Sequence, residues 1–198
     1  MIDYIKGQGA ELNPAYAVLD NHGVGYMINI SLTTFNSVQR AQQSGSDVKL
    51  FVYEAIREDA HLLYGFADRS ERELFVLLIS VPGVGPNTAR VILSSLPPSE
   101  LVQTIAGNNA AMLKSVKGIG AKTAQRIIVD LKDKINGVDD ALLSGTALPS
   151  GEVFDEAMSA LVMLGFTKQM SQKALKKLFA DNPAISVEDA IKKALKMM

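Results

Sequence analysis

The strongest constraint in this sequence is a nine-residue pattern that occurs twice. Residues 81–89 read VPGVGPNTA and residues 116–124 read VKGIGAKTA. Both fit V-x-G-(V/I)-G-x-x-T-A, with their first glycines 35 residues apart. Paired glycines between apolar residues are typical of a tight turn, because glycine adopts backbone angles that other residues disfavour. Apolar residues at helical spacing flank each copy. The sequence therefore predicts a duplicated helix–loop–helix unit.

Glycine loops that open a helix often hold the phosphates of a nucleotide, but neither copy has the residues for this. An ATP-binding loop requires G-x-x-x-x-G-K-(S/T). In the second copy Ala121 replaces the glycine before Lys122 and Val116 replaces the first glycine, while the first copy has Asn87 instead of the lysine. A dinucleotide-binding loop needs a third glycine and a preceding strand, which both copies lack. We therefore expect no nucleotide and no other cofactor.

The loops suit the phosphates of a nucleic-acid backbone better. Each loop ends where a helix is predicted to begin, and the free N–H groups and dipole of a helix N-terminus attract anions. Lys122 and Arg126 are four residues apart, so they share one helix face beside the second loop. Two such loops can hold two points on a backbone without reading bases. The pattern resembles the helix-hairpin-helix motif of DNA-binding proteins that do not select a sequence.

The candidate DNA-binding residues come from both copies, and they lie in the most basic part of the chain. Residues 67–135 carry a net charge of +3, whereas residues 1–66 carry −3 and the whole chain −1. Positive charge is therefore concentrated in the segment that the motif assigns to DNA. The candidates are Val81, Gly83, Val84, Gly85, Asn87 and Thr88 in the first copy, and Lys117, Gly118, Ile119, Gly120, Lys122, Thr123 and Arg126 in the second.

Composition excludes several other classes of protein. The chain has no cysteine, so it has no disulfide, cysteine zinc site or thiol nucleophile. His22 and His61 are the only histidines, and no acidic cluster has the pattern of a two-metal nuclease, so no metal site is expected. No apolar run reaches the ~18 residues of a membrane span. We expect a cytoplasmic, nucleoid-associated protein with no membrane partner.

Changes in periodicity divide the chain into four segments with an α+β, multidomain organisation. In residues 1–66, short strands around a turn at residues 21–23 predict a small antiparallel barrel. Residues 67–135 hold the tandem hairpins. Residues 136–151 are rich in Gly, Ser and Asp, which predicts a flexible linker. Residues 152–198 predict a bundle of three helices, the last of them capped by Ser186.

An acidic turn extends the resemblance to the whole chain. Residues 57–66 read REDAHLLYGF, so Glu58 and Asp59 precede a strand that ends in Tyr-Gly-Phe. This turn, the duplicated hairpins, the loose linker and the small helical tail follow one another in that order. The chain thereby resembles the RuvA family, the DNA-binding subunits of the bacterial complex that moves Holliday junctions.

The resemblance implies both an architecture and a function. The barrel is expected to be OB-like and to assemble a homotetramer on which an open four-way junction lies flat, with a second tetramer able to cover the other face. Glu58 and Asp59 form an acidic pin at the crossover. Residues 152–198 form a UBA-like domain that contacts the RuvB ATPase through residues that the resemblance does not identify. The chain is then a non-catalytic subunit for homologous recombination and DNA repair. RuvB hydrolyses ATP, and the RuvC resolvase cuts the junction.

Other interpretations remain open at this point. An isolated Glu-Asp pair is typical of an exposed turn, and only the resemblance favours a pin. Hairpin motifs also occur in generic DNA-repair proteins, nucleases and glycosylases, which need a catalytic carboxylate or lysine beside the loops. The glycine loops also fit a protein-only scaffold. The chain departs from the family at Asn87 and Ala121, where lysine is common, and at Lys117, where proline is common. Phosphate contact is therefore expected to rest more on backbone amides, Lys117, Lys122 and Arg126.

Overall fold

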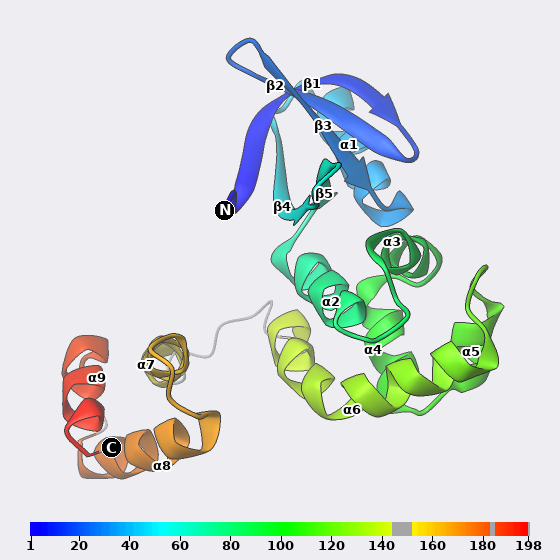
Figure 1. Ribbon diagram of the computed structural model, residues 1–198. Coiled ribbons are helices and arrows are strands. Elements are labelled where there is room, and N and C mark those ends of the chain that lie inside the picture. Colours follow the sequence, from blue (N-terminus) through cyan, green and yellow to red (C-terminus); the bar gives the residue numbers. More distant parts are fainter. Residues whose placement is uncertain (144–151, 183–184, 198) are drawn as a thin grey trace. The chain divides into compact units, whose positions relative to one another are not determined.

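The computed structural model describes residues 1–143, 152–182 and 185–197. The chain divides into two compact units, Met1–Leu143 and Ser144–Met198 (Figure 1). The first unit contains a β-barrel followed by helices, and the second is helical. Buried apolar side chains form a separate core in the second unit. Among the described residues, no helix is long and apolar enough to cross a membrane.

The N-terminal part of the first unit is a closed barrel of five strands, in agreement with the predicted OB-like barrel. The strands are β1 (Tyr4–Asn13), β2 (Tyr16–Asn21), β3 (Val24–Ile30), β4 (Val48–Ile56) and β5 (His61–Phe66). Their order around the barrel is β1-β2-β3-β5-β4. The β2–β3 hairpin turns where the sequence predicts. His22 and Gly23 both have positive φ, at 52° and 85°, which is the conformation of a tight two-residue hairpin turn.

The barrel differs from the prediction because it is not wholly antiparallel. β3 pairs with β5 in parallel, with Ile30 opposite Gly65. A parallel pair requires a crossover connection, and here α1 (Leu32–Gln43) and β4 lie between the two strands in the chain. α1 was not predicted, since its sequence is mostly polar and only Thr34 and Val38 are buried. Ser31 fixes its start by accepting a hydrogen bond from the Thr34 N–H at 3.0 Å.

Five helices complete the first unit. They are α2 (Arg69–Ile79), α3 (Pro86–Ser95), α4 (Pro98–Ala106), α5 (Ala110–Ser115) and α6 (Ala121–Leu143), as Figure 1 shows. Their core includes two aromatic residues from the end of β5. The Phe75 ring lies 5.3 Å from that of Tyr64 and 4.9 Å from that of Phe66. The Tyr-Gly-Phe ending of β5 thus joins the barrel to the hairpin helices.

The linker predicted at residues 136–151 starts before the preceding helix has ended. α6 continues to Leu143, so the first half of residues 136–151 is helical, and residues 144–151 lie outside the described residues. Asn136 and Gly137 suggested a break. However, one glycine inside a helix costs only about 1 kcal/mol, and Ala141, Leu142 and Leu143 are strong helix formers.

The second unit is a bundle of three helices, as predicted. They are α7 (Glu152–Met163), α8 (Lys168–Asp181) and α9 (Val187–Leu195). α7 ends in a glycine turn, in which Gly165 has a φ of 98° and the Phe166 N–H bonds to the Leu161 carbonyl at 3.1 Å. Ser186 caps α9 by accepting from the Asp189 N–H at 3.2 Å, which confirms the predicted cap.

Candidate nucleic-acid interface

The first glycine loop is a tight turn anchored in the core. The Val84 N–H bonds to the Val81 carbonyl at 3.0 Å, and Gly83 has a φ of 92°. This hydrogen bond, with proline at the second position and a positive φ at the third, identifies a type II turn. The side chains of Val81 and Val84 are buried, whereas Gly83 is exposed. The two valines therefore hold the turn, and any contact that they make with DNA comes from their backbone.

The second loop repeats this geometry. The Ile119 N–H bonds to the Val116 carbonyl at 3.1 Å, and Gly118 has a φ of 90°. The Ile119 side chain is buried like that of Val84. Lys117 occupies the second position of this turn, which most residues tolerate in this type of turn. Its replacement of the usual proline leaves the turn intact and adds an exposed cation.

Each loop leads directly into a helix whose first N–H groups are free of intrahelical bonds. The first intrahelical bonds run from the Ala89 N–H to the Gly85 carbonyl and from the Ala124 N–H to the Gly120 carbonyl, both at 2.9 Å. No side chain caps the start of α3. The amides that precede these bonds can therefore receive an anion. Thr88 and Thr123 are half-buried at the equivalent position of the two helices.

The two hairpins differ in what their exposed side chains contact. In the first, the Tyr64 hydroxyl donates to Asn87 Oδ1 at 3.4 Å. Arg90 donates to the Ala15 carbonyl at 2.8 Å and to Asn29 Oδ1 at 3.3 Å. These contacts fasten α3 to the barrel. Asn87 is consequently a weaker candidate for binding DNA than its position in the motif suggests.

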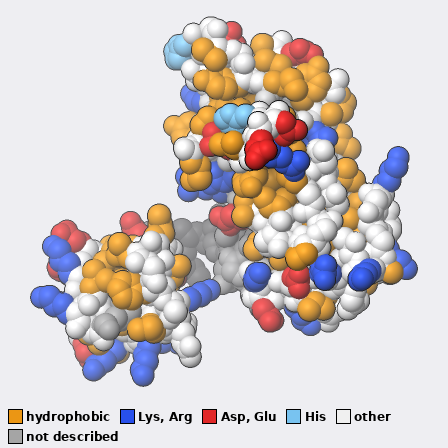
Figure 2. All heavy atoms as spheres, viewed as in Figure 1, with side chains coloured by type: hydrophobic (Ala, Val, Ile, Leu, Met, Phe, Trp, Pro, Cys, Tyr) orange, Lys and Arg blue, Asp and Glu red, His pale blue; other side chains and the backbone are white. Residues whose placement is uncertain are grey.

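The second hairpin presents its cations to solvent. Lys117, Lys122 and Arg126 are exposed, and Lys122 takes the place of Asn87. Arg126 also donates to the Pro82 carbonyl at 3.4 Å, which brings this residue of α6 beside the first loop. One guanidinium hydrogen bond leaves further donors on Arg126 for a phosphate. Figure 2 shows Lys and Arg side chains along the edge of the helical part of this unit.

The acidic turn closes the β4–β5 hairpin as predicted. The last strand pair is Ile56 and His61, and the Arg57 N–H bonds to the Ala60 carbonyl at 2.8 Å. Glu58 and Asp59 are exposed at the tip, and neither forms an ion pair with another described residue. The turn therefore presents two carboxylates to solvent.

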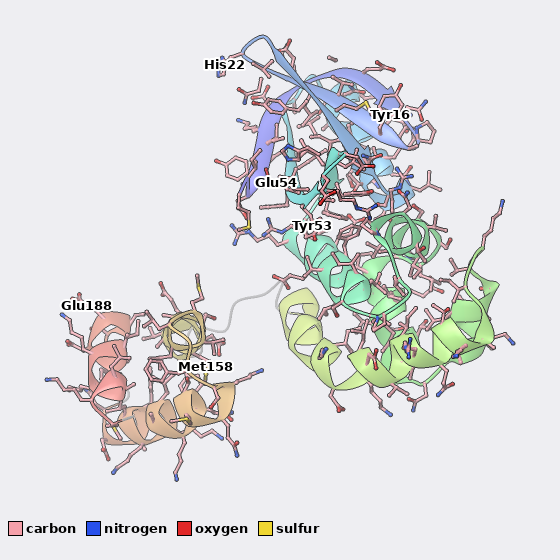
Figure 3. All side chains as sticks on the ribbon, in the orientation of Figure 1. Tyr16, His22, Tyr53, Glu54, Met158 and Glu188 are labelled. Carbon is pink, nitrogen blue, oxygen red and sulfur yellow. The ribbon has the colours of Figure 1, made fainter. Side chains whose placement is uncertain are left out.

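The base of this hairpin is held by Glu54, which Figure 3 labels on β4. Its carboxylate accepts from the Ile2 N–H at 3.2 Å and lies 3.6 Å from His61 Nε2. The Glu54 side chain is only 12% exposed. Glu54 therefore holds together the two strands below the acidic tip and also bonds to the N-terminal segment.

A buried carboxylate connects the barrel to the hairpin helices. Glu71 of α2 accepts hydrogen bonds from the hydroxyls of Ser31 and of Thr34, the latter at 2.7 Å. Thr34 in turn accepts from the Ala67 N–H at 3.1 Å. Burial raises the pKa of Glu71, and the two hydroxyls oppose that shift. The network joins α1, the end of β5 and α2, so it fixes the barrel relative to the hairpin helices.

The described residues contain no group of three metal-ligating side chains that could hold a metal ion. The candidate interface therefore consists of backbone amides, hydroxyls, three exposed cations and one acidic tip. Such groups can bind and orient a phosphate backbone.

Comparison with known proteins finds matches to all three parts of the chain. A model of the RuvA N-terminal domain matches residues 1–65, and one of the SAM-like helix-hairpin-helix tandem matches residues 75–133. A model of the RuvA C-terminal domain matches residues 152–198. A Bacteroides fragilis relative is 57% identical over 205 residues that cover both chains completely. The chain belongs to the RuvA family.

Further relatives show the same full coverage. One from Bacteroides thetaiotaomicron is 53% identical, and one from Christiangramia forsetii is 46% identical. All three carry the name Holliday junction branch migration complex subunit RuvA. The predicted family is thereby confirmed, and with it the α+β organisation of barrel, hairpins and helical tail.

Sequence reasoning missed three residues that position the interface. Arg90, Tyr64 and Glu71 each join the barrel to the hairpin helices. Arg90 follows the first repeat directly, where the second repeat is followed by Gln125. This difference between the two copies is the sequence signal that the first copy makes different contacts.

Proposed function

We propose that the protein binds four-way DNA junctions as the non-catalytic subunit of a branch-migration complex in recombination and repair. The observation that carries this proposal is the pair of type II loops, each opening a helix, in a chain related over its full length to junction-complex subunits. The loops offer amides and cations that suit a phosphate backbone. No base-reading pattern is needed, because the motif grips the backbone of any sequence.

The acidic tip gives the proposed mechanism its second part. Glu58 and Asp59 are exposed and unpaired, so they repel phosphates at the crossover. The repulsion between two charges 4 Å apart is about 1 kcal/mol in water and larger where water is excluded. Carboxylates from four subunits around the crossover hold the backbones apart while strands exchange partners.

The homotetramer follows from the family resemblance and is supported by an apolar surface beside the pin. A groove between β4 and α2 is lined by Met1, Ile56, Val76 and Leu77 among others. Ile56 is 69% exposed and Val76 is 42% exposed. If four pins meet at one crossover, the surfaces beside each pin face neighbouring subunits. Burial of these side chains then stabilises the tetramer, and a second tetramer can cover the open face of the junction.

The C-terminal unit is proposed to contact the RuvB ATPase, while RuvC acts later on the bound junction. The end of α7 and the start of α8 expose an apolar patch, which we define as Val162, Met163, Leu164 and Met170. Met163 is 88% exposed and Leu164 is 59% exposed. Flexible methionine side chains suit an adaptable contact surface.

The proposal is tested by a gel shift of the purified full chain on a four-way junction against duplex DNA of equal length, with and without magnesium. We expect strong preference for the junction. Equal binding to both would leave a generic hairpin DNA-binding protein, and no binding at low salt would leave a protein scaffold.

The double variant Lys122→Ala/Arg126→Ala is expected to weaken junction binding equally for all DNA sequences. The slope of log affinity against log salt should fall by up to about two, because each lost phosphate contact removes about 0.9. The control Arg40→Ala/Lys132→Ala removes two exposed cations elsewhere and should leave the slope nearly unchanged. A loss that depends on DNA sequence would contradict backbone contact.

The variant Met163→Ser/Leu164→Ser is expected to bind junctions normally and to lose ATPase-driven branch migration. Both side chains are exposed, so the bundle should remain folded. The readout is strand exchange on a mobile junction with the motor subunit present. Met27→Ser, an exposed apolar position on the barrel, is the control. Full migration by the double variant would show that this patch is not the motor contact.

A further inference from the structure

The charges on helix α8 are arranged in a way that does not stabilise the helix itself. Lys168, Lys173, Lys176 and Lys177 all lie on it and are exposed. Residues 157–180 contain no aspartate or glutamate, although the C-terminal unit has six acidic residues elsewhere. Lys173 is three and four residues from Lys176 and Lys177, so these side chains are neighbours on one face. Like charges at this spacing destabilise a helix.

The charges at the two ends of α8 are also opposite to those that its helix dipole favours. Lys168 is its first residue and Asp181 its last, with no acidic residue in the first turn and no basic residue in the last. A cation at the N-terminus and an anion at the C-terminus each oppose the dipole. The charges of α8 are thus arranged against the stability of the isolated helix.

The neighbouring helix α9 shows the opposite arrangement. Glu188 and Asp189 lie in its first turn and Lys192 and Lys193 in its last, as the dipole favours. Lys192 and Glu188 form an ion pair at 2.5 Å, the only one within the described part of this unit. Figure 3 labels Glu188 on α9. Lys192 is therefore paired within α9 and Lys193 lies where the dipole favours a cation, whereas no α8 lysine forms an ion pair with another described residue.

The lysines of α8 face solvent together. Ser171, Ala174 and Leu175 point into the core of the bundle, and the lysines occupy the remaining face. Figure 2 shows Lys and Arg side chains projecting from the outer surface of this unit. Four uncompensated cations lie along nine residue steps, or about 13 Å at 1.5 Å per residue. Duplex DNA presents phosphates every 3.4 Å along each strand.

We propose that this surface of α8, formed by Lys168, Lys173, Lys176 and Lys177, is a second contact for the DNA backbone. It rests on the proposed junction binding, since the hairpins bring the DNA to the protein. Lysine is a compact point charge that neutralises phosphates without reading bases. A weak contact of this kind is strengthened by attachment to a chain already bound to the same DNA.

The test compares two full-length triple variants on one four-way junction. Lys173→Gln/Lys176→Gln/Lys177→Gln removes three cations from α8. The control Lys192→Gln/Lys193→Gln/Lys196→Gln removes two from α9 and one from its C-cap. Glutamine has nearly the helix propensity of lysine, so both should remain folded, which circular dichroism checks. Affinity is measured between 50 and 200 mM salt.

We expect the α8 variant to lose about tenfold or more in affinity at low salt, with a salt slope shallower by about two to three. The α9 variant should retain the wild-type slope. Junction DNA should also protect Lys173, Lys176 and Lys177 from acetylation in the wild type, as mass spectrometry reports.

Two outcomes overturn this inference while the proposed junction binding stands. Equal losses in both variants would show an effect of net charge alone. An unchanged slope in the α8 variant would show that its lysines do not touch DNA, and loss of motor-driven migration in that variant would assign them to a protein partner. Failure of the wild type to bind junctions would instead remove the proposed function itself.

Discussion

Glu71→Ala is expected to lower the free energy of unfolding by about 2–5 kcal/mol. The substitution removes the acceptor of two buried hydroxyls, those of Ser31 and Thr34, and an unsatisfied buried donor costs about 1–3 kcal/mol. It also leaves a cavity between α1 and α2. Chemical denaturation of the full chain measures the change. Glu71→Gln keeps an acceptor at this place and should cost much less. Equal stability of the alanine variant and the wild type would show that the network is not needed.

The same residue predicts a pH dependence. Burial raises the pKa of Glu71, so the folded state holds its proton to higher pH than the unfolded chain does. The contribution of this group to the free energy of unfolding is therefore greatest at low pH. It decreases as pH rises from the ordinary glutamate pKa, about 4.3, to the raised pKa. Glu71→Gln lacks this term, so its stability relative to wild type should rise across that window.

Gly83→Ala/Gly118→Ala is expected to reduce junction affinity by about 100-fold or more. Both glycines have φ near 90°, where other residues are strained by about 1–2 kcal/mol. No atom lies within 4 Å of a Cβ added at either position, so strain in the turn is the only cost. The turns should relax and misplace the amides that open α3 and α6. A gel shift on the four-way junction measures the loss.

Gly23→Ala is a matched control for the glycine variants. Gly23 has a φ of 85° and equally open surroundings, but it lies in the β2–β3 turn. It should cost similar stability per site without loss of junction binding. If the control weakens binding as much as the double variant Gly83→Ala/Gly118→Ala does, the effect comes from stability and not from the loops.

The sequence alone predicts the elements whose geometry is set by nearby residues. The two loops were predicted residue by residue, because glycine, apolar anchors and the following helix all lie within nine positions. The cap at Ser186 is a local signal of the same kind. The family resemblance supplied the role of the acidic turn as a pin, which no periodicity identifies.

The sequence does not predict contacts between distant segments. Glu71 lies in a stretch that reads as an exposed charged helix, and its partners are 37 and 40 residues away. α1 is held mainly by its packing against the barrel and shows little apolar period of its own. The Tyr-Gly-Phe motif can be recognised in the sequence, but the need for its glycine comes from the close packing of two strands. A Cβ on Gly65 would lie 2.5 Å from Ile28, so only glycine allows β3 and β5 to pair there.

The contacts between the first hairpin and the barrel fix a distance within each subunit. Arg90 and Glu71 fasten the hairpin helices to the barrel, so the distance between the acidic turn and the first glycine loop is set within one compact unit. The two hairpins share one turn geometry but differ in their contacts. Arg90 of the first bonds to the barrel, whereas Lys117 and Lys122 of the second are exposed. If the loops and the acidic turn bind DNA as we propose, this fixed distance holds every arm at the same separation from the crossover.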